Sequence, residues 1–232
     1  MPLLLSSVKR LSMLRHDLAF FVRKGQVVRL KLLGFEAYFL SPSRAEFKRI
    51  RVAGSEKKII RPFLEEVHSG DVVFDVGASV GIYTIFLAKK AGSTGRVFAF
   101  EPELQSRGRL MEDIGLNSLN NVTVFKDGLG SERSTQFLVP DENFSSGAHG
   151  IFKKRSTGTG FDRMTEVEIF PGDEFIRGNS LPIPNVLKVD VEGMEYDVLL
   201  GLADTLKKKE CRLVLCEIHF SELERRGMPQ AP

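Results

Sequence analysis

Acidic residues stand at the ends of five apolar segments in the second two thirds of the chain. They are Asp75, Glu101, Asp127, Asp190 and Glu217. A carboxylate beside a desolvated crevice is costly unless it has a partner. Because parallel strands present their carboxyl ends at one edge of a sheet, we expect these side chains to gather there. The set indicates a ligand that is rich in hydrogen-bond donors.

The first of these ends opens a glycine-containing segment, DVGASVG, at residues 75–81. Gly77 and Gly81 allow a tight turn and a close approach of the backbone to a ligand, and the helix that follows offers free N–H groups. A nicotinamide fingerprint needs glycine where this chain has Ser79 and Ile82, so that class of site is disfavoured. A phosphate-binding P-loop is disfavoured as well, because no Gly-Lys-Ser/Thr follows.

Two acidic residues around this segment indicate the kind of ligand. Glu101 stands twenty residues after Gly81, at the end of the second predicted strand, where an acidic residue can accept both hydroxyls of a ribose. Asp75, before the glycines, favours a cationic ligand without a pyrophosphate. A nucleoside with an amino-acid tail fits both, and we expect S-adenosylmethionine as the cofactor.

Two later strand ends carry groups that suit acid–base chemistry. Asp190 and Glu192 are two residues apart in KVDVEG, so they point the same way from an extended strand, as does Lys188. Glu217 and His219 should face them across the crevice. Asp190, Glu192 and His219 are the predicted catalytic residues, with His219 taking a proton from an attacking hydroxyl while a carboxylate orients it.

Other uses of these residues stay open at this point. Asp190 and Glu192 would also serve as caps of the following helix or as positioning groups for the cofactor. With His219 they would equally form a divalent-metal site that lowers the pKa of an acceptor hydroxyl, but we assign no metal ligands. A strong base is optional, because methyl transfer needs mainly in-line placement of nucleophile and methyl group.

The elements that must position these residues alternate between strand and helix. Nearly continuous apolar runs are typical of strands buried on both faces, and alternating strands and helices predict an α/β fold with a doubly wound, mostly parallel sheet. The predicted strands are 71–78, 96–102, 121–128, 185–193 and 212–220, with helices at 80–91, 103–117 and 193–209. An inserted hairpin is expected at about 129–172, with strands at 135–139 and 165–170 and a basic tip.

The first part of the chain reads as an extension of this core. Apolar residues at helical spacing predict an amphipathic helix over residues 1–25, short strands follow within 26–52, and a second helix is expected at 55–70. We therefore divide the chain into an extension at 1–59 and a main domain at 60–232. The helix is too interrupted by charge for a secretory signal or a membrane span, although it suits packing on its own domain or peripheral contact with a membrane.

Charge and cysteine content limit the partners and the compartment. The 232 residues carry a net charge of +3, but residues 1–70 hold 14 Lys or Arg and 6 Asp or Glu, whereas the rest of the chain is net acidic. Nucleic acid is disfavoured as a partner, because the Asp/Asn-Pro-Pro-Tyr motif of DNA methyltransferases is absent. Two cysteines that cannot pair within an extended run predict a reducing, cytoplasmic location.

Five segments taken together resemble one family. VVFDVGASVGIYTIFLA, VFAFEP, NV followed by GLG, LKVDVEGMEYDVLLG and LCEIH occur in this order, and over about residues 60–220 they closely resemble the FkbM family of S-adenosylmethionine-dependent methyltransferases. The resemblance implies a class I methyltransferase core and O-methyl transfer to a sugar, a glycan or a secondary metabolite. It places Asp127 near adenine. The family usually has Asn where this chain has Ser79. The expected cofactor-binding residues are Asp75, Gly77, Ala78, Ser79, Gly81, Tyr83, Glu101, Pro102 and Asp127.

A truncated or non-catalytic S-adenosylmethionine-binding protein is the alternative. The sequence runs 13 residues past His219, whereas the fold normally adds two further strands after the fifth. The last two strands are therefore expected to be missing. The fifth strand would then be an apolar sheet edge, which favours a homodimer through that edge.

Overall fold

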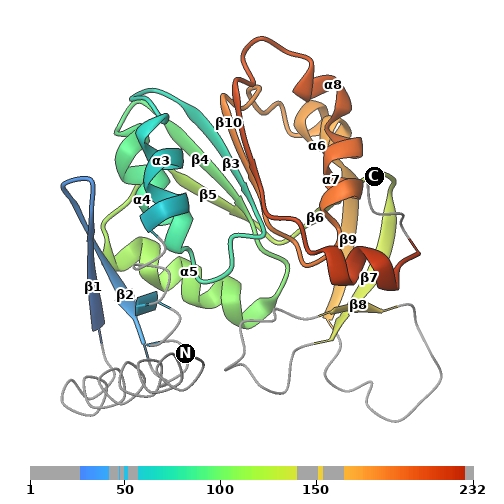
Figure 1. The fold of residues 1–232 in the computed structure, drawn as a ribbon, viewed down its shortest axis with the longest axis horizontal. Helices are drawn as coiled ribbons and strands as arrows, with labels where there is room; N and C mark the ends of the chain where they lie inside the picture. Colours follow the sequence, from blue (N-terminus) through green and yellow to red (C-terminus); the bar gives the residue numbers. More distant parts are fainter. Residues whose placement is uncertain are drawn as a thin grey trace, which may run out of the picture.

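The computed structural model describes residues 27–41, 47, 50–51, 57–139, 151–153 and 165–227. Figure 1 shows a central sheet with helices packed on both sides. The amphipathic helix expected over residues 1–25 and nearly all of the basic tip of the inserted hairpin lie outside the described residues. Within the described residues, no helix has the length and apolar content needed to span a membrane.

Five parallel strands form the central sheet. They are β3 (Val72–Val76), β4 (Arg96–Phe100), β5 (Val122–Phe125), β10 (Val186–Val189) and β11 (Leu213–Cys216), in the order β11-β10-β3-β4-β5. The predicted parallel α/β sheet is confirmed. The chain builds outward in both directions from the boundary between β3 and β10, and ligands of such sheets bind at this boundary, beyond the carboxyl ends of the strands.

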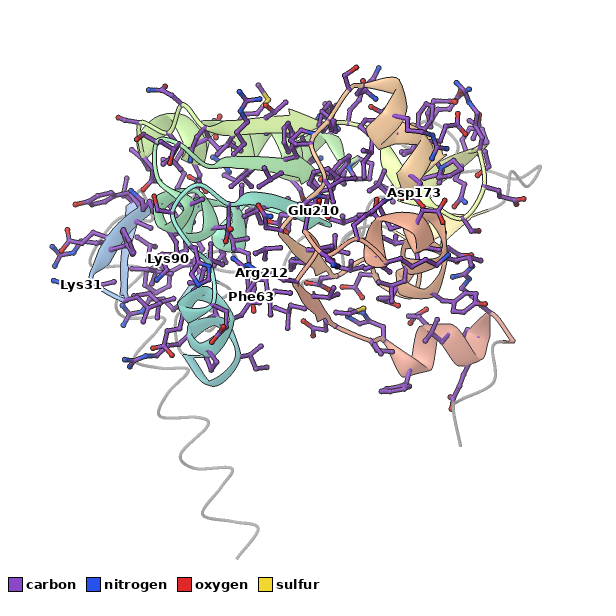
Figure 2. All side chains as sticks on the ribbon, turned by 90° about the horizontal axis from the view of Figure 1, so that it is seen from above. Lys31, Phe63, Lys90, Asp173, Glu210 and Arg212 are labelled. Atoms are coloured by element: carbon purple, nitrogen blue, oxygen red, sulfur yellow. The ribbon has the colours of Figure 1, made fainter. Side chains whose placement is uncertain are left out.

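Two helical layers cover the sheet because its residues alternate between two apolar faces. On one face, Val73 and Val97 pack in a cluster with α3 (Lys57–Glu65) and α4 (Ile82–Ala91), and α5 (Leu104–Leu116) lies beside them. On the other face, Phe74 and Phe98 pack against α6 (Gly172–Gly178) and α7 (Glu195–Gly201). In Figure 2, Phe63 on α3 and Asp173 on α6 mark the two layers.

An N-terminal hairpin packs on the first of these layers. Strands β1 (Val27–Leu32) and β2 (Phe35–Leu40) share the hydrophobic cluster of α3 and α4. Side chains of α5 and of its C-cap residue, Asn117, take the place of a neighbouring strand. Leu40 N donates to Asp113 Oδ1 at 2.8 Å, and Asn117 bonds both the N–H and the carbonyl of Tyr38. The edge of β2 is thus satisfied by two side chains of the main domain.

The sequence prediction of strands through residue 52 is wrong beyond β2. Phe47, Ile50 and Arg51 are helical, and Phe47 and Ile50 are buried in the same cluster as the hairpin. The two apolar residues pack from a helix, whose spacing places positions 47 and 50 on one side, while Arg51 is exposed. The division of the chain at residue 59 stays a prediction.

The insertion forms a second sheet, larger than the expected hairpin. Strands β7 (Ser134–Val139) and β9 (Thr165–Pro171) pair antiparallel at the two predicted positions. Two short strands, β6 (Gly128–Gly130) and β8 (Ile151–Lys153), complete the order β6-β9-β7-β8. The segment Gly128–Gly130 has low strand propensity, and its pairing with β9 depends on a contact that is distant in sequence.

The single helix expected at 193–209 is wrong, because the chain forms two helices there. These are α7 and α8 (Ala203–Leu206). Gly201 ends α7 against the backbone of Gly130, where a side chain would collide with the carbonyl oxygen. Asp173 of α6 then accepts bonds from the N–H groups of Asp204 and Thr205 and so caps α8. Strand β11 is the edge of the described sheet, and α9 (Phe220–Arg225) follows it.

Candidate functional site

The loop after β3 turns tightly beneath the loop after β10. Gly77 and Gly81 have φ angles of 78° and 88°, in the left-handed region that favours glycine. A side chain at Gly77 would collide with the carbonyl oxygen of Asp190, and one at Gly81 would collide with Leu110 of α5. Both glycines are therefore required for packing between protein segments. Close approach of the backbone to a ligand, the other use expected for these two glycines, stays a prediction.

Ser79 and Ala78 complete this loop. Ser79 has a φ of 53°, an uncommon value for a residue other than Gly, Asn or Asp. The asparagine that the resemblance predicts at this position would suit that conformation, so Ser79 keeps the shape of the loop with the less favoured residue. Ala78 is buried, and its N–H donates to the carbonyl of Phe100 at 3.1 Å. The loop is thereby held against the end of β4.

Glu101 lies at the end of β4 as predicted and is almost fully buried. One carboxylate oxygen accepts the N–H of Ser79 at 2.7 Å, and the other accepts the N–H of Glu103 at 2.9 Å. Each oxygen keeps a second lone pair. Burial raises the pKa of Glu101 to about 7, although the two N–H groups act in the opposite direction.

The neighbouring acidic residue, Glu103, has a different task. Its side chain caps α5 by accepting the N–H groups of Gln105 and Ser106. The carbonyl of Pro102 accepts a bond from Arg107 at 2.7 Å, which holds this turn in place. Glu101 is therefore the acidic residue of the pair that remains directed at the loop after β3.

Below the loop, a buried cluster joins β3 to β10. Asp75 is fully buried and accepts a bond from Thr84 Oγ1 of α4 at 2.6 Å. Lys188, in register with Asp75 on the adjacent strand, donates to the carbonyl of Gly77 at 2.8 Å and lies 3.3 Å from Asp75 and 3.4 Å from Asp190. Burial alone lowers the pKa of Lys188, but the two carboxylates outweigh it and the pKa is raised.

The predicted catalytic residues lie together at the ends of β10 and β11. His219 Nε2 is 3.4 Å from Glu192 and 3.9 Å from Asp190, and His219 Nδ1 is 2.7 Å from Glu195 Oε1. Burial lowers the pKa of His219, but the bond to Glu195 and the charges of Glu192 and Asp190 raise it above the ordinary value. Burial also raises the pKa of Glu192.

Glu195 was missed by the sequence analysis. It is buried at the start of α7, and its Oε1 also accepts the N–H of Gly193. It stands three residues after Glu192, so the signal available in the sequence was a further acidic residue in the first turn of the helix that follows the strand end. Neither Asp190 nor Glu192 caps α7 with its side chain, because the cap residue is Met194 and no side-chain bond is formed there.

The turn between β10 and α7 is strained and is held by Arg226, the residue that follows α9. Glu192 has a φ of 51° and Gly193 a φ of 94°, so two successive residues are left-handed. Arg226 donates to the carbonyl of Gly193 and also pairs with Asp197. The orientation of Glu192 toward His219 thus depends on contacts made by Arg226, directly after the last described helix.

Two predicted cofactor residues have less defined surroundings. Tyr83 is half-buried on α4, with its ring 6.3 Å from that of Phe63 and with Lys188 Nζ 5.3 Å from its centre. Asp127 is half-buried in the segment between β5 and β6. Among the residues that the structure describes, no group of three or more His, Cys, Asp or Glu side chains has the arrangement of a metal site.

A parallel sheet in this order, with a glycine loop after β3 and a buried glutamate after β4, is the architecture of class I S-adenosylmethionine-dependent methyltransferases. Residues 75–230 match the model of the methyltransferase FkbM domain. The chain belongs to this family, and the resemblance of its five motifs to the family is confirmed.

Several known proteins are similar to this chain. Hexuronic acid methyltransferase AglP of Haloferax volcanii is 34% identical over 186 residues, which cover 80% of this chain and 72% of that protein. Methyltransferase sdnD of Sordaria araneosa is 26% identical over 58% of this chain and 61% of its own length. A solved structure from Geobacter metallireducens, described as precorrin-6y C5,15-methyltransferase, is 14% identical over 73% of this chain and 67% of that chain, with a TM-score of 0.44.

The residues present fit the cofactor of this class. The Glu101 carboxylate has one unused lone pair on each oxygen, which matches the two hydroxyl donors of a ribose. Asp75, Asp190 and Lys188 together carry one net negative charge beside the loop, which suits a cationic ligand. The protein is an S-adenosylmethionine-dependent methyltransferase. Which side chains touch the cofactor stays a prediction.

Proposed function

We propose that this methyltransferase acts on a hydroxyl group of a sugar or glycan, with His219 as the general base. The observation that carries the proposal is the 2.7 Å contact between His219 Nδ1 and the buried Glu195, which leaves Nε2 directed toward the predicted acceptor side of the site. The relative named as a hexuronic acid methyltransferase supports an acceptor of the sugar class.

The residues around His219 suit a polyhydroxylated acceptor. S-adenosylmethionine supplies an electrophilic methyl group when it is bound. Glu195 holds the imidazole in one orientation, so that Nε2 accepts the proton of the attacking hydroxyl. Asp190 and Glu192 are about 30% exposed and offer acceptor oxygens to neighbouring hydroxyl groups of the same sugar. The loop after β3 and Glu101 hold the nucleoside on the other side.

Three earlier expectations remain part of this proposal. The two cysteines, Cys211 and Cys216, are unpaired, which supports a reducing, cytoplasmic compartment. Peripheral membrane contact through residues 1–25 and a homodimer through the edge of β11 also stay predictions.

The first experiment separates a methyltransferase from a protein that only binds the cofactor. Calorimetric titration with S-adenosylmethionine should show binding, and an assay with a panel of monosaccharides, uronic acids and short glycans should show methyl transfer. Absence of binding contradicts the cofactor assignment. Binding without transfer to any hydroxylated acceptor favours the non-catalytic alternative.

The second experiment tests the base. In His219→Asn the amide can still donate to Glu195, but the group at the Nε2 position is lost, so transfer should fall about 10²-fold or more while cofactor affinity changes little. His68→Asn is the matched control, because His68 lies after α3 and contacts Arg212. Transfer by His219→Asn at the rate of the unmodified protein would rule His219 out as the base.

A further inference from the structure

Lys188 is a buried charge that contacts residues on both sides of the boundary between β3 and β10. The residue is 4% exposed, and its ammonium group contacts the carbonyl of Gly77, Asp75 and Asp190, with the ring of Tyr83 5.3 Å away. Gly77 belongs to the cofactor loop, whereas Asp190 belongs to the loop that carries the acceptor side. The lysine therefore lies beneath the place where the two halves of the site meet.

Stability alone does not account for a lysine at this position. The other three residues of β10, Val186, Leu187 and Val189, are apolar and fully buried. A buried ion pair in such surroundings is often no more stable than apolar side chains of similar volume. An apolar residue facing a neutral partner on β3 would complete the strand, so a lysine facing Asp75 indicates a role in the site.

Its electrostatic effect is to reduce the negative charge of the site. Asp75 and Asp190 would otherwise contribute two negative charges, and Lys188 leaves one. The sulfonium of S-adenosylmethionine is positive, and this charge disappears when the methyl group leaves. Strong negative potential at the sulfur would stabilise the bound donor more than the transition state, and this would slow transfer.

The position of the cluster relates it to the sulfur. Lys188 contacts the loop that is expected to hold the cofactor, and Asp190 lies between Lys188 and His219, at 3.4 and 3.9 Å. A methyl group that passes from cofactor to acceptor must travel between that loop and His219. We propose, on the basis of the methyltransferase function above, that Lys188 is a positioning residue that sets the electrostatic potential at the sulfur of the cofactor.

Two ligands that differ by one charge provide the test. S-adenosylmethionine carries the sulfonium charge and S-adenosylhomocysteine does not, so the ratio of their Kd values reports the potential at the sulfur. Calorimetry on Lys188→Met should show the ratio shifted roughly fivefold in favour of S-adenosylmethionine, the effect of one unit charge several ångströms away in a partly solvated crevice. A purely structural role would weaken both ligands equally.

Variants of Asp75 complete a charge cycle and keep the test valid if Lys188→Met folds poorly. Asp75→Asn keeps an acceptor for Thr84 and should shift the ratio the opposite way, toward S-adenosylhomocysteine. Combining Asp75→Asn with Lys188→Met removes a buried pair together and should restore the original ratio. An unchanged ratio in the Asp75→Asn variant, or one that does not return in the double variant, overturns the proposal. Failure of the unmodified protein to bind either ligand would instead contradict the cofactor assignment.

Discussion

The buried carboxyl group of Glu101 predicts that cofactor binding depends on pH near neutrality. Its pKa is raised from 4.5 to about 7 by burial, so part of the population is protonated at neutral pH. Ribose hydroxyls that donate to this group stabilise its ionised form, and a protonated Glu101 must lose its proton when the cofactor binds. Affinity should therefore rise with pH until the group is ionised in the free protein.

The size of this effect follows from the raised pKa. With a pKa of about 7, roughly a tenth of the molecules carry an ionised Glu101 at pH 6 and roughly nine tenths at pH 8. The Kd for S-adenosylmethionine should therefore fall about tenfold from pH 6 to pH 8. Glu101→Gln cannot ionise and should bind at least tenfold more weakly at pH 8, without the pH dependence that Glu101 contributes.

The same group predicts how the stability of the cofactor-free protein changes. Between pH 4.5 and about 7 the unfolded chain ionises at Glu101 before the folded protein does, so the folded state holds more protons and its stability falls as pH rises. The loss from this group approaches about 3 kcal/mol above pH 7. Urea unfolding of the unmodified protein and of Glu101→Gln should show this difference in slope, since the variant lacks the titrating group.

Comparison of slopes avoids a complication in the variant. In Glu101→Gln the amide N–H₂ faces one of the two backbone N–H groups that donate to Glu101. Two donors then face each other, and this lowers stability at every pH. Glu132→Gln, an exposed position, is the control for the loss of one carboxylate. Equal Kd values at pH 6 and pH 8 for the folded, unmodified protein would refute the assignment of Glu101 to the ribose.

Three further predictions concern the base, the cofactor loop and the N-terminal hairpin. Glu195→Gln removes the largest contribution that raises the pKa of His219, so the rise of the transfer rate with pH should move to lower pH; an unshifted profile would show that Glu195 does not act on the base. Gly77→Ala should lower the free energy of unfolding by about 2 kcal/mol or more in urea titrations, because a side chain there collides with a neighbouring carbonyl at a φ of 78°. Asn117→Ala leaves two exposed backbone groups of Tyr38 on β2 to water and should lower the free energy of unfolding by about 1 kcal/mol, with faster hydrogen exchange in the hairpin; unchanged exchange would contradict this anchoring role.

The main sheet was predictable because its signal is local. Residues such as Val73 and Phe74 lie in short apolar runs that are buried on both faces, and each run precedes a helix with its own periodicity. The order of these elements, together with the handedness of strand–helix–strand units, limits the fold to few arrangements. The polar residues that follow the strands were therefore expected to meet at one edge, and Asp190 and Glu192 do lie beside His219 there.

Elements held by distant contacts were predicted less well. The strand Gly128–Gly130 exists because it pairs with β9, about 40 residues later. The break between α7 and α8 depends on Gly130 and Asp173, which are far from it in sequence. Neither partner is visible in the periodicity of the segment itself, so the local pattern predicted one long helix.

The sequence by itself determined the class of the protein. Asp75, the glycine loop and Glu101 lie in two successive strand–loop–helix segments, and the local apolar pattern of each segment is enough to place them at the strand ends. Only the tertiary structure decided what these residues do. It buries Asp75 beneath the loop together with Lys188. It also requires glycine at position 77, because a side chain there would collide with the carbonyl oxygen of Asp190. These roles depend on which side chains meet across β3 and β10, and burial and charge act between neighbours in space.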